Sequence, residues 1–300
     1  MDAYIWHNGS IIPKVDAKVD ILSFTLHYGY GFFEGVRAYQ TAEGTAIFRL
    51  QDHTNRFFHS AHLLNVELPY TKTQINQAHI DVLKWNKFNS AYIRPICYFG
   101  PGIGLHTRDL EINVLLAALP WDAYMGEEKL TKGLALKTST IVRHNVNSVF
   151  TKAKATGNYL NSILALQEAR ACQCDEALML DTDGFVTEAS AQNFFIVENN
   201  CLITPDVSSA LPGITRDSVI QFANKFGIDV VERRISRDEV YGADEAFLTG
   251  TAAEITPVTS VDFRKIGDGQ RGAITKALQE QYFKVVRGQA PEFSAWLTLV

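Results

Sequence analysis

Cysteine is scarce in this sequence of 300 residues, which contains only Cys97, Cys172, Cys174 and Cys201. No two of them form a C-x-x-C pair, and the C-Q-C stretch at 172–174 lacks a second pair of ligands. The pattern therefore argues against a zinc site. We expect no metal, and reduced thiols of the kind found in cytoplasmic proteins.

Long apolar runs and strong net charge are also lacking. No stretch approaches the roughly 20 apolar residues that cross a bilayer, and the first residues, MDAYIWHNGSIIPK, do not resemble a secretory signal. The net charge is −5 and the isoelectric point is about 5.9, so no overall attraction to nucleic acid or anionic lipid is expected. We expect a cytoplasmic protein with no nucleic-acid or membrane partner.

The composition is that of a globular protein with a large core. Hydrophobic residues make up 46% and charged residues 20% of the chain, and its length suggests two domains that need no disulfide. The interruption PWDAYMGEE at 120–128 is the candidate connection between two halves, each of which mixes strands and helices. This organisation predicts an α+β or α/β protein with a cleft between its domains.

Local patterns predict individual elements. Residues 4–12 predict a β-hairpin. The aromatic and glycine-containing residues 24–40 predict strand and close-packed loop. Helices are expected at 52–64, with Asp52 as N-cap, and at 157–171. The second helix should present an apolar face made of Leu160, Ile163, Leu164 and Leu166.

Lys154 lies in the sequence KAKATGNY, among small residues that let a flat ligand approach its amine. A lysine in such a place can form a Schiff base with an aldehyde if partial burial lowers its pKa. Tyr159 follows five residues later, at the start of a predicted helix. A solvated lysine before a helix is the commoner situation, so this segment alone does not establish a catalytic site.

Two turns have the composition of phosphate sites. In LPGITRDS, residues 211–218, a Pro-Gly turn precedes Thr215, which can begin a helix whose first N–H groups bind a phosphate. In LTGTAAEITPV, residues 248–258, a strand ends in small residues and the Thr251 hydroxyl. An ordinary capped helix and an ordinary strand-to-loop turn remain open as explanations.

Three charged residues have small or apolar neighbours or a helical position. Glu188, in FVTEASAQN, needs a partner if it is buried, and a pyridinium N–H would be one. Arg94, in AYIRPI, lies beside Tyr92 in an apolar strand and should meet an anion there. Arg56 lies on the first long predicted helix. Surface positions for Glu188 and Arg56, and an internal carboxylate partner for Arg94, remain open.

Seven segments make the chain resemble the branched-chain aminotransferase family of pyridoxal-phosphate fold type IV, and the resemblance covers nearly the whole chain. The segments are FEGVRAY at 33–39, HTNR at 53–56, YIRP at 92–95, KATGNY at 154–159, TEASAQN at 187–193, LPGITRDS at 211–218 and GTAAEITPV at 250–258. The resemblance implies an α+β fold of two domains. They are a small α/β domain at 1–120, a connecting loop at 121–131, and a larger, β-barrel-like mixed domain with helices at 132–300.

The resemblance also implies pyridoxal 5′-phosphate as cofactor, and a ping-pong transamination of leucine, isoleucine and valine with 2-oxoglutarate that yields 2-oxo acids and L-glutamate. Lys154 would form the Schiff base and move a proton. Glu188 would keep the pyridine nitrogen protonated, so that the ring acts as an electron sink. Tyr159 would hydrogen-bond the phenolic oxygen of the cofactor. The phosphate would be held by Arg56, Ile214, Thr215 and Thr251.

By the same resemblance, Tyr92 and the amides near Ala252 and Ala253 form the site for the substrate α-carboxylate. Arg94 would meet the distal carboxylate of glutamate. The pocket must also take leucine-like side chains, and its aromatic residues would provide apolar walls. Those residues are Tyr28, Phe33, Trp121 and Tyr124.

The resemblance further implies a homodimer, or a hexamer built as a trimer of dimers, with the active site near the dimer interface. The loop GPGIGLH at 100–106 matches the segment that reaches a neighbouring subunit, with Leu105 at its tip. Several residues depart from the usual family pattern and bear on substrate preference rather than on the chemistry. They are Thr156, Ala189, Ala191, Gln192 and, where prolines are common, Val146 and Phe150.

Two alternatives remain open. Another enzyme of fold type IV, either a D-amino acid aminotransferase or an aminodeoxychorismate lyase, would share the cofactor residues. Arg94 and the run at 250–258 favour the branched-chain hypothesis over this one. A protein that binds a phosphorylated ligand without turnover would have no use for Lys154 or Glu188.

Overall fold

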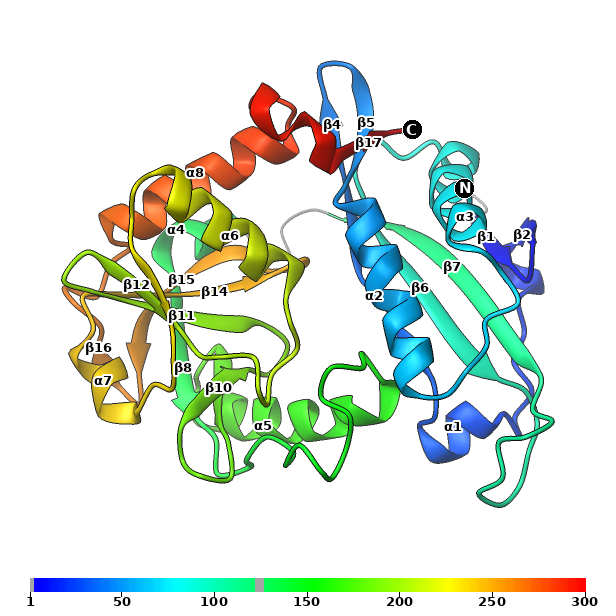
Figure 1. Ribbon diagram of the computed structural model, residues 1–300, viewed down its shortest axis with the longest axis horizontal. Coiled ribbons are helices and arrows are strands. Elements are labelled where there is room, and N and C mark those ends of the chain that lie inside the picture. The colour runs from blue at the N-terminus through cyan, green and yellow to red at the C-terminus, as the bar shows by residue number, and fades with distance from the viewer. Residues whose placement is uncertain (1–2, 122–126) are drawn as a thin grey trace. The chain divides into compact units, whose positions relative to one another are not determined.

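The computed structural model describes residues 3–121 and 127–300, and its contacts divide the chain into two compact units. The first unit contains Met1–Asp122, Ala153–Gly157 and Val285–Val300, and the second contains Ala123–Lys152 and Asn158–Lys284. The segment around Lys154 and the C-terminal residues thus join the first unit, although they follow it at a distance along the chain (Figure 1).

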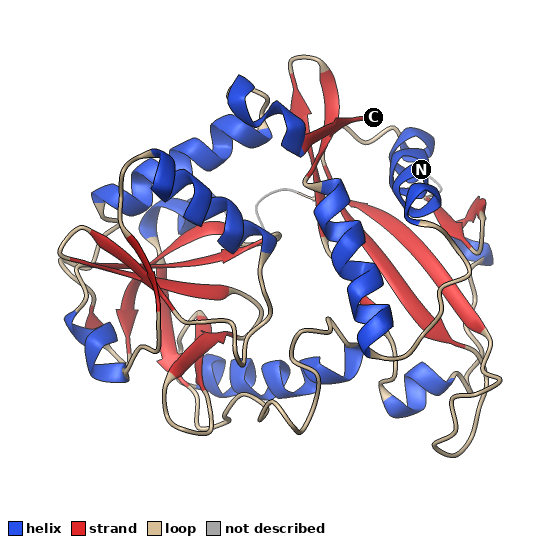
Figure 2. Cartoon of the chain, viewed as in Figure 1, coloured by secondary structure: helices blue, strands red, loops and turns tan. Residues whose placement is uncertain are grey.

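An antiparallel sheet forms the centre of the first unit (Figure 2). Its strands pair in the order β17-β5-β4-β6-β7-β1-β2, and β3 pairs with β6. The predicted hairpin is confirmed, with Ile5 opposite Ile12, and the C-terminal strand pairs with β5. The strands are β1 (Tyr4–His7), β2 (Ser10–Pro13), β3 (Phe32–Phe33), β4 (Val36–Thr41), β5 (Gly44–Phe48), β6 (Ala91–Phe99), β7 (Ile112–Pro120) and β17 (Leu297–Leu299).

The helices of this unit are α1 (Phe24–Tyr28), α2 (Leu50–Leu63) and α3 (Lys72–Asn86), with short 3-10 helices at Lys14–Asp16 and Pro291–Trp296. Apolar residues of β4 and β6, among them Val36, Ala38 and Ile93, share one buried cluster with Leu50 of α2 and Val82 of α3. Side chains alternate between the two faces of a strand. The intervening residues of β4 and β6 therefore belong to the opposite face.

Two predictions for the first unit are wrong. Residues 24–28 form α1 rather than strand or loop, and this short helix ends at Gly29, which has a φ of +68° that glycine adopts without strain. Asp52 is not an N-cap, because α2 already begins at Leu50 after Arg49. Asp52 lies in the first helical turn, where a carboxylate is favourable, and it pairs with Arg49 Nε at 2.5 Å.

The second unit contains a closed ring of six strands. They pair in the order β10-β9-β8-β15-β14-β11, and β11 pairs back with β10. A sheet closed in this way is a β-barrel and leaves no edge within the ring. Buried Leu136, Phe194, Leu248 and Val258 belong to its core. The strands are β8 (Leu134–Thr138), β9 (Glu176–Leu180), β10 (Val186–Ala189), β11 (Asn193–Glu198), β12 (Cys201–Thr204), β13 (Val230–Glu232), β14 (Glu245–Gly250), β15 (Glu254–Val261) and β16 (Arg264–Lys265).

Helix α5 corrects the predicted apolar face. Its buried residues are Ser162, Ala165 and Ala169, whereas Leu160, Ile163 and Leu164 are exposed and Leu166 is half-buried. The small residues let α5 pack closely on β9. The remaining helices are α4 (Glu127–Lys132), the 3-10 turn Thr156–Asn158, α5 itself (Tyr159–Ala171), α6 (Ile214–Lys225), α7 (Arg237–Gly242) and α8 (Ala273–Val286). Within the described part of the chain, no helix has both the length and the apolar character needed to span a membrane.

Acid should destabilise the first unit through His79 of α3. This side chain is 1% exposed, donates from Nδ1 to the Ile75 carbonyl at 2.8 Å, and lacks a hydrogen-bond partner for Nε2 among the described residues. Burial lowers the pKa of His79 from 6.5 to about 4. Since the folded pKa lies below the unfolded one, protonation favours the unfolded chain, and stability falls as the pH drops from 6.5 towards 4.

All four tryptophans, Trp6, Trp85, Trp121 and Trp296, lie in the first unit, so their fluorescence follows its unfolding. In urea titrations we expect His79 to account for a loss of about 2 kcal/mol between about pH 7.5 and about pH 5. His79→Leu should reduce this pH dependence, and the exposed histidine variant His59→Asn should leave it unchanged. An equal pH dependence in His79→Leu and the unsubstituted chain would contradict the assignment.

Candidate functional site

The segment around Lys154 is bonded along its backbone to the first unit. Lys154 donates its backbone N–H to Ser60 Oγ of α2 at 3.0 Å and accepts at its carbonyl from the N–H of Phe33 at 3.0 Å. Thr156 donates its hydroxyl to the Gly29 carbonyl at 2.6 Å. The Lys154 Nζ lies 5.2 Å from the centre of the Phe33 ring. The structure thus fixes the backbone of the predicted catalytic lysine from both sides.

Arginine and aromatic side chains gather beside this segment on β3 and β6. The guanidinium of Arg94 stacks over the Phe33 ring at 4.5 Å and donates from Nη2 to the Tyr92 hydroxyl at 2.9 Å. Tyr92 in turn lies 5.2 Å from Trp121, ring centre to ring centre. A Cβ on Gly35 would come within 2.2 Å of the Tyr92 hydroxyl, so only glycine leaves room for it. The structure therefore brings four of the predicted substrate residues together.

Three other predicted substrate residues are not placed in this group. Tyr28 is 44% exposed at the end of α1, and its hydroxyl accepts a hydrogen bond from the Gly104 N–H at 3.2 Å. Leu105 is 81% exposed on the same loop as Gly104. Tyr124 lies outside the described residues.

Arg56 of α2 pairs with a buried acid that sequence analysis did not identify. Its Nε donates to Glu34 Oε1 at 2.6 Å and its Nη2 to Glu34 Oε2 at 2.9 Å. His53 Nδ1 lies 2.8 Å from the same Oε2. Glu34 has no exposed surface. A lone acid within the apolar run at 32–36 is a signal of such a pair, because a buried carboxylate requires a counter-charge.

Glu188 lies on β10 in the second unit and is 4% exposed. Its Oε1 lies 2.6 Å from Arg143 Nε, an ion pair without the angle of a hydrogen bond, so both atoms also lack a hydrogen-bond partner in the part of the chain that is described. We regard the contact as ionic, since two opposite charges at this distance attract whatever the angle. Arg143 is held in place by Asn161 Oδ1 and Ser162 Oγ of α5, each 3.3 Å from its Nη1.

A second cation of the same unit, Lys152, ties the loop that leads to Leu211. Its Nζ donates to the carbonyls of Ser208 at 3.0 Å and Ala210 at 3.2 Å. The N–H of Leu211 then points to Glu188 Oε2 at 3.4 Å. Burial lowers the pKa of Lys152, although the charges of Glu188 and Asp206 oppose this effect. Glu188 is thus surrounded by groups that stabilise its ionised form.

The two predicted phosphate turns have the expected form. Helix α6 begins at Ile214 after Gly213, which provides no side-chain cap. Thr215 is 3% exposed in the first turn. A Cβ on Gly213 would lie 1.9 Å from Asn193 Oδ1, so this position requires glycine. The other turn, which contains Thr251, Ala252 and Ala253, joins β14 to β15. Tyr159 is the first residue of α5.

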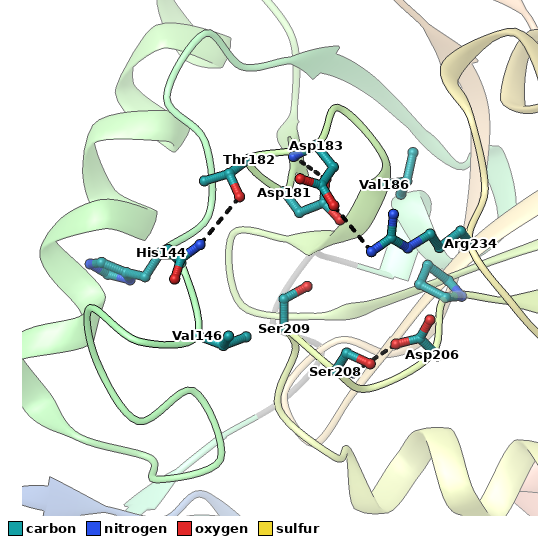
Figure 3. Close-up of a pocket in the computed structure, with 12 residues that line it drawn as sticks. His144, Val146, Asp181, Thr182, Asp183, Val186, Asp206, Ser208, Ser209 and Arg234 are labelled. Carbon is teal, nitrogen blue, oxygen red and sulfur yellow. Dashed lines mark hydrogen bonds and ion pairs between the residues drawn. The ribbon is translucent and has the colours of Figure 1, made fainter.

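A pocket of about 200 Å³ in the second unit contains none of the predicted site residues (Figure 3). Its charges are satisfied locally: Arg234 Nη2 lies 3.1 Å from Asp183 Oδ2, and Asp206 accepts from the Ser208 N–H at 2.8 Å. Such turns and exposed pairs do not indicate a ligand. The described residues also contain no group of three or more metal-binding side chains. All four cysteines are free thiols.

Comparison with known proteins identifies the family. The family model described as amino-transferase class IV matches residues 31–261. The branched-chain-amino-acid aminotransferase of Pseudomonas aeruginosa is 50% identical over 300 residues, which cover 100% of this chain and 98% of that protein. This chain belongs to the branched-chain aminotransferase family. The predicted family is confirmed.

Solved structures of branched-chain aminotransferases share the fold. The enzyme from the organism abbreviated T.th., solved with pyridoxamine 5′-phosphate, has a TM-score of 0.97 and 44% identity, and the match covers 100% of this chain and 99% of that one. The same enzyme complexed with N-(5′-phosphopyridoxyl)-L-glutamate has a TM-score of 0.96 and 42% identity, with coverage of 100% and 99%. The predicted fold class, α+β with a β-barrel-like second part, is confirmed.

Proposed function

We propose that this branched-chain aminotransferase uses pyridoxal 5′-phosphate to transfer the amino group of leucine, isoleucine or valine to 2-oxoglutarate. The observation that carries the proposal is the 50% identity over the whole chain to a protein named for branched-chain substrates. We further propose that residues 1–120 and 132–300 are its two domains, with 121–131 as the connection.

The residues of the second unit suit the cofactor ring and phosphate. Glu188 Oε1 is buried and accepts no hydrogen bond from the described residues, so it has capacity for the N–H of a pyridinium. The neighbouring Arg143 keeps this carboxylate ionised. The first turn of α6, with Ile214 and Thr215, provides backbone N–H groups and a hydroxyl for a phosphate. Thr251 adds a second hydroxyl.

Within this proposal, the cofactor supplies an electron sink when it is bound. The Lys154 amine holds the cofactor aldehyde and moves the proton of the substrate Cα. Glu188 keeps a proton on the ring nitrogen. Tyr159 donates its hydroxyl to the phenolic oxygen, and Arg56 binds the phosphate. The amides near Ala252 and Ala253, together with Tyr92, bind the substrate α-carboxylate.

The pocket must accept both an isobutyl group and a distal carboxylate, and Arg94 is suited to this double task. Its guanidinium stacks flat on Phe33, and an arginine face of this kind tolerates apolar groups while its edge binds an anion. Tyr92 fixes the orientation of the guanidinium. Tyr28, Trp121 and Tyr124 would add apolar surface.

Arg94→Met should therefore separate the two half-reactions. We expect the KM for 2-oxoglutarate to rise by about tenfold or more, because a charge-assisted hydrogen bond is lost. The rate of the half-reaction with leucine should change far less. Stopped-flow measurement of each half-reaction tests this, with the exposed Arg170→Met on α5 as control. Equal losses with both substrates would refute the assignment of Arg94.

A panel of L- and D-amino acids with 2-oxoglutarate as acceptor tests the substrate class. We expect turnover of L-leucine, L-isoleucine and L-valine. Consumption of D-alanine in their place would replace the proposal with a D-amino acid aminotransferase.

We also propose that the protein is a homodimer, or a hexamer built from three dimers. Two segments of the first unit expose apolar side chains that a monomer would leave in water. Leu105 and Ile103 lie on the loop at 100–106, and Ile21 and Leu26 lie before and within α1. Light scattering coupled to gel filtration measures the assembly directly. A monomer at micromolar concentration would contradict this proposal.

A further inference from the structure

The ion pair between Glu34 and Arg56 holds an arginine by one edge. Glu34 is fully buried, and both of its oxygens are used: Oε1 accepts from Arg56 Nε at 2.6 Å and Oε2 accepts from Arg56 Nη2 at 2.9 Å. Two parallel hydrogen bonds of this kind fix the plane of a guanidinium as well as its position. Arg56 is therefore not a mobile surface arginine.

The charges in this cluster are balanced. Burial alone would raise the pKa of Glu34, but the charge of Arg56 and the hydrogen bonds from His53 and Arg56 hold it well below its ordinary value. Burial lowers the pKa of His53, so its imidazole is neutral and its Nδ1–H donates to Glu34. One anion and one cation remain, with a neutral donor that supports the anion.

The same helix face also holds the lysine segment. His53, Arg56 and Ser60 follow one another at spacings of three and four residues along α2, which places them on one side of the helix. Ser60 accepts the backbone N–H of Lys154, and the Lys154 carbonyl accepts from Phe33, the residue before Glu34. Glu34 thus lies where β3 and α2 jointly fix both Arg56 and the backbone of Lys154.

We propose that Glu34 is a positioning residue for the cofactor phosphate: it fixes Arg56 through Nε and Nη2 and thereby orients the rest of the guanidinium towards a phosphate. A guanidinium has five N–H donors, and Glu34 uses two of them. Holding the side chain before the ligand arrives reduces the conformational entropy lost on binding. The inference rests on the proposed function, specifically on Arg56 as a phosphate ligand.

A purely structural ion pair is the competing explanation, and the two make different predictions for a cofactor without its phosphate. If Glu34 only stabilises the fold, its loss should weaken pyridoxal 5′-phosphate and pyridoxal equally. If Glu34 positions Arg56 for the phosphate, only the phosphorylated aldehyde should be affected. The affinity ratio of the two aldehydes is therefore the informative quantity, because a general loss of structure cancels in it.

Glu34→Gln in the full chain tests this, because the amide preserves the shape but cannot accept from all three donors. We expect the Kd for pyridoxal 5′-phosphate to rise by about tenfold or more, the effect of losing a charge-assisted hydrogen bond. The Kd for pyridoxal should stay within about twofold, since it has no phosphate for Arg56 to bind. Both constants are measured by titrating cofactor-depleted full-length protein and following absorbance and tryptophan fluorescence.

Asp52→Asn is the matched control, since Asp52 also pairs with an arginine on α2 but is 44% exposed. It should leave the ratio unchanged. Glu34→Asp, which keeps the charge but shortens its reach, provides the same readout if the glutamine variant does not fold. An unchanged ratio in the foldable Glu34 variant overturns the inference. An unchanged ratio in Arg56→Met would show that the proposed phosphate role of Arg56 has failed, while absence of any aldehyde binding by the unsubstituted chain would refute the proposed function.

Discussion

Lys154→Ala is expected to lower transamination by ~10³-fold or more, because the variant loses both the amine that holds the aldehyde and the base that moves the substrate proton. The absorbance band of the imine should be absent from the variant after incubation with pyridoxal 5′-phosphate. The backbone of residue 154 keeps its bonds to Ser60 and Phe33, so we expect the fold to be preserved. Stopped-flow kinetics and circular dichroism measure the two effects separately.

Lys152 is the rival amine, since it lies two residues away and burial lowers its pKa. However, its Nζ donates to the carbonyls of Ser208 and Ala210. An ammonium group held in this way offers only donors and must break these bonds before it can attack an aldehyde. Borohydride reduction and peptide mapping should locate the adduct at Lys154 in both the unsubstituted chain and Lys152→Met. An adduct at position 152 would refute the mechanism.

Glu188→Gln is expected to lower kcat/KM by ~10²-fold or more, the loss typical of removing one preorganised electrostatic group. The amide cannot balance a positive ring nitrogen, so the ring withdraws electrons less strongly. The variant also leaves the 8% exposed Arg143 without its counter-charge, and breaking a buried ion pair costs about 3–5 kcal/mol. Turnover and stability should therefore fall together in this variant. Glu198→Gln, an exposed acid at the end of β11, is the control.

A double variant separates these two effects. In Arg143→Met with Glu188→Met no uncompensated buried charge remains, and replacing a whole buried pair by apolar residues is often neutral for stability. We expect the stability lost in Glu188→Gln to be largely restored, while turnover stays low. Recovery of turnover together with stability would mean that Glu188 acts only as the counter-ion of Arg143.

The local patterns predicted much of the fold because they depend on neighbouring residues. The hairpin at 4–12 and the strands β6 and β7 follow from alternation and turn composition. The apolar face of α5 was predicted wrongly for the same reason: periodicity identifies an amphipathic helix but not which side is buried. In the structure, Ala165 and Ala169 pack inward and Leu160 is exposed.

The residue types that carry the proposed chemistry are already determined by the sequence: a lysine among small residues, a solitary acid at Glu188, an arginine in an apolar strand, and two glycine-containing turns. Motifs of four to nine residues sufficed to indicate the family. Only the tertiary structure decided the partners of these groups, namely Glu34 for Arg56, Arg143 for Glu188, and Tyr92 and Phe33 for Arg94. The physical reason is range. Backbone preferences and periodicity act over a few residues, whereas a buried charge takes its counter-charge from whichever part of the chain the fold brings within a few ångströms.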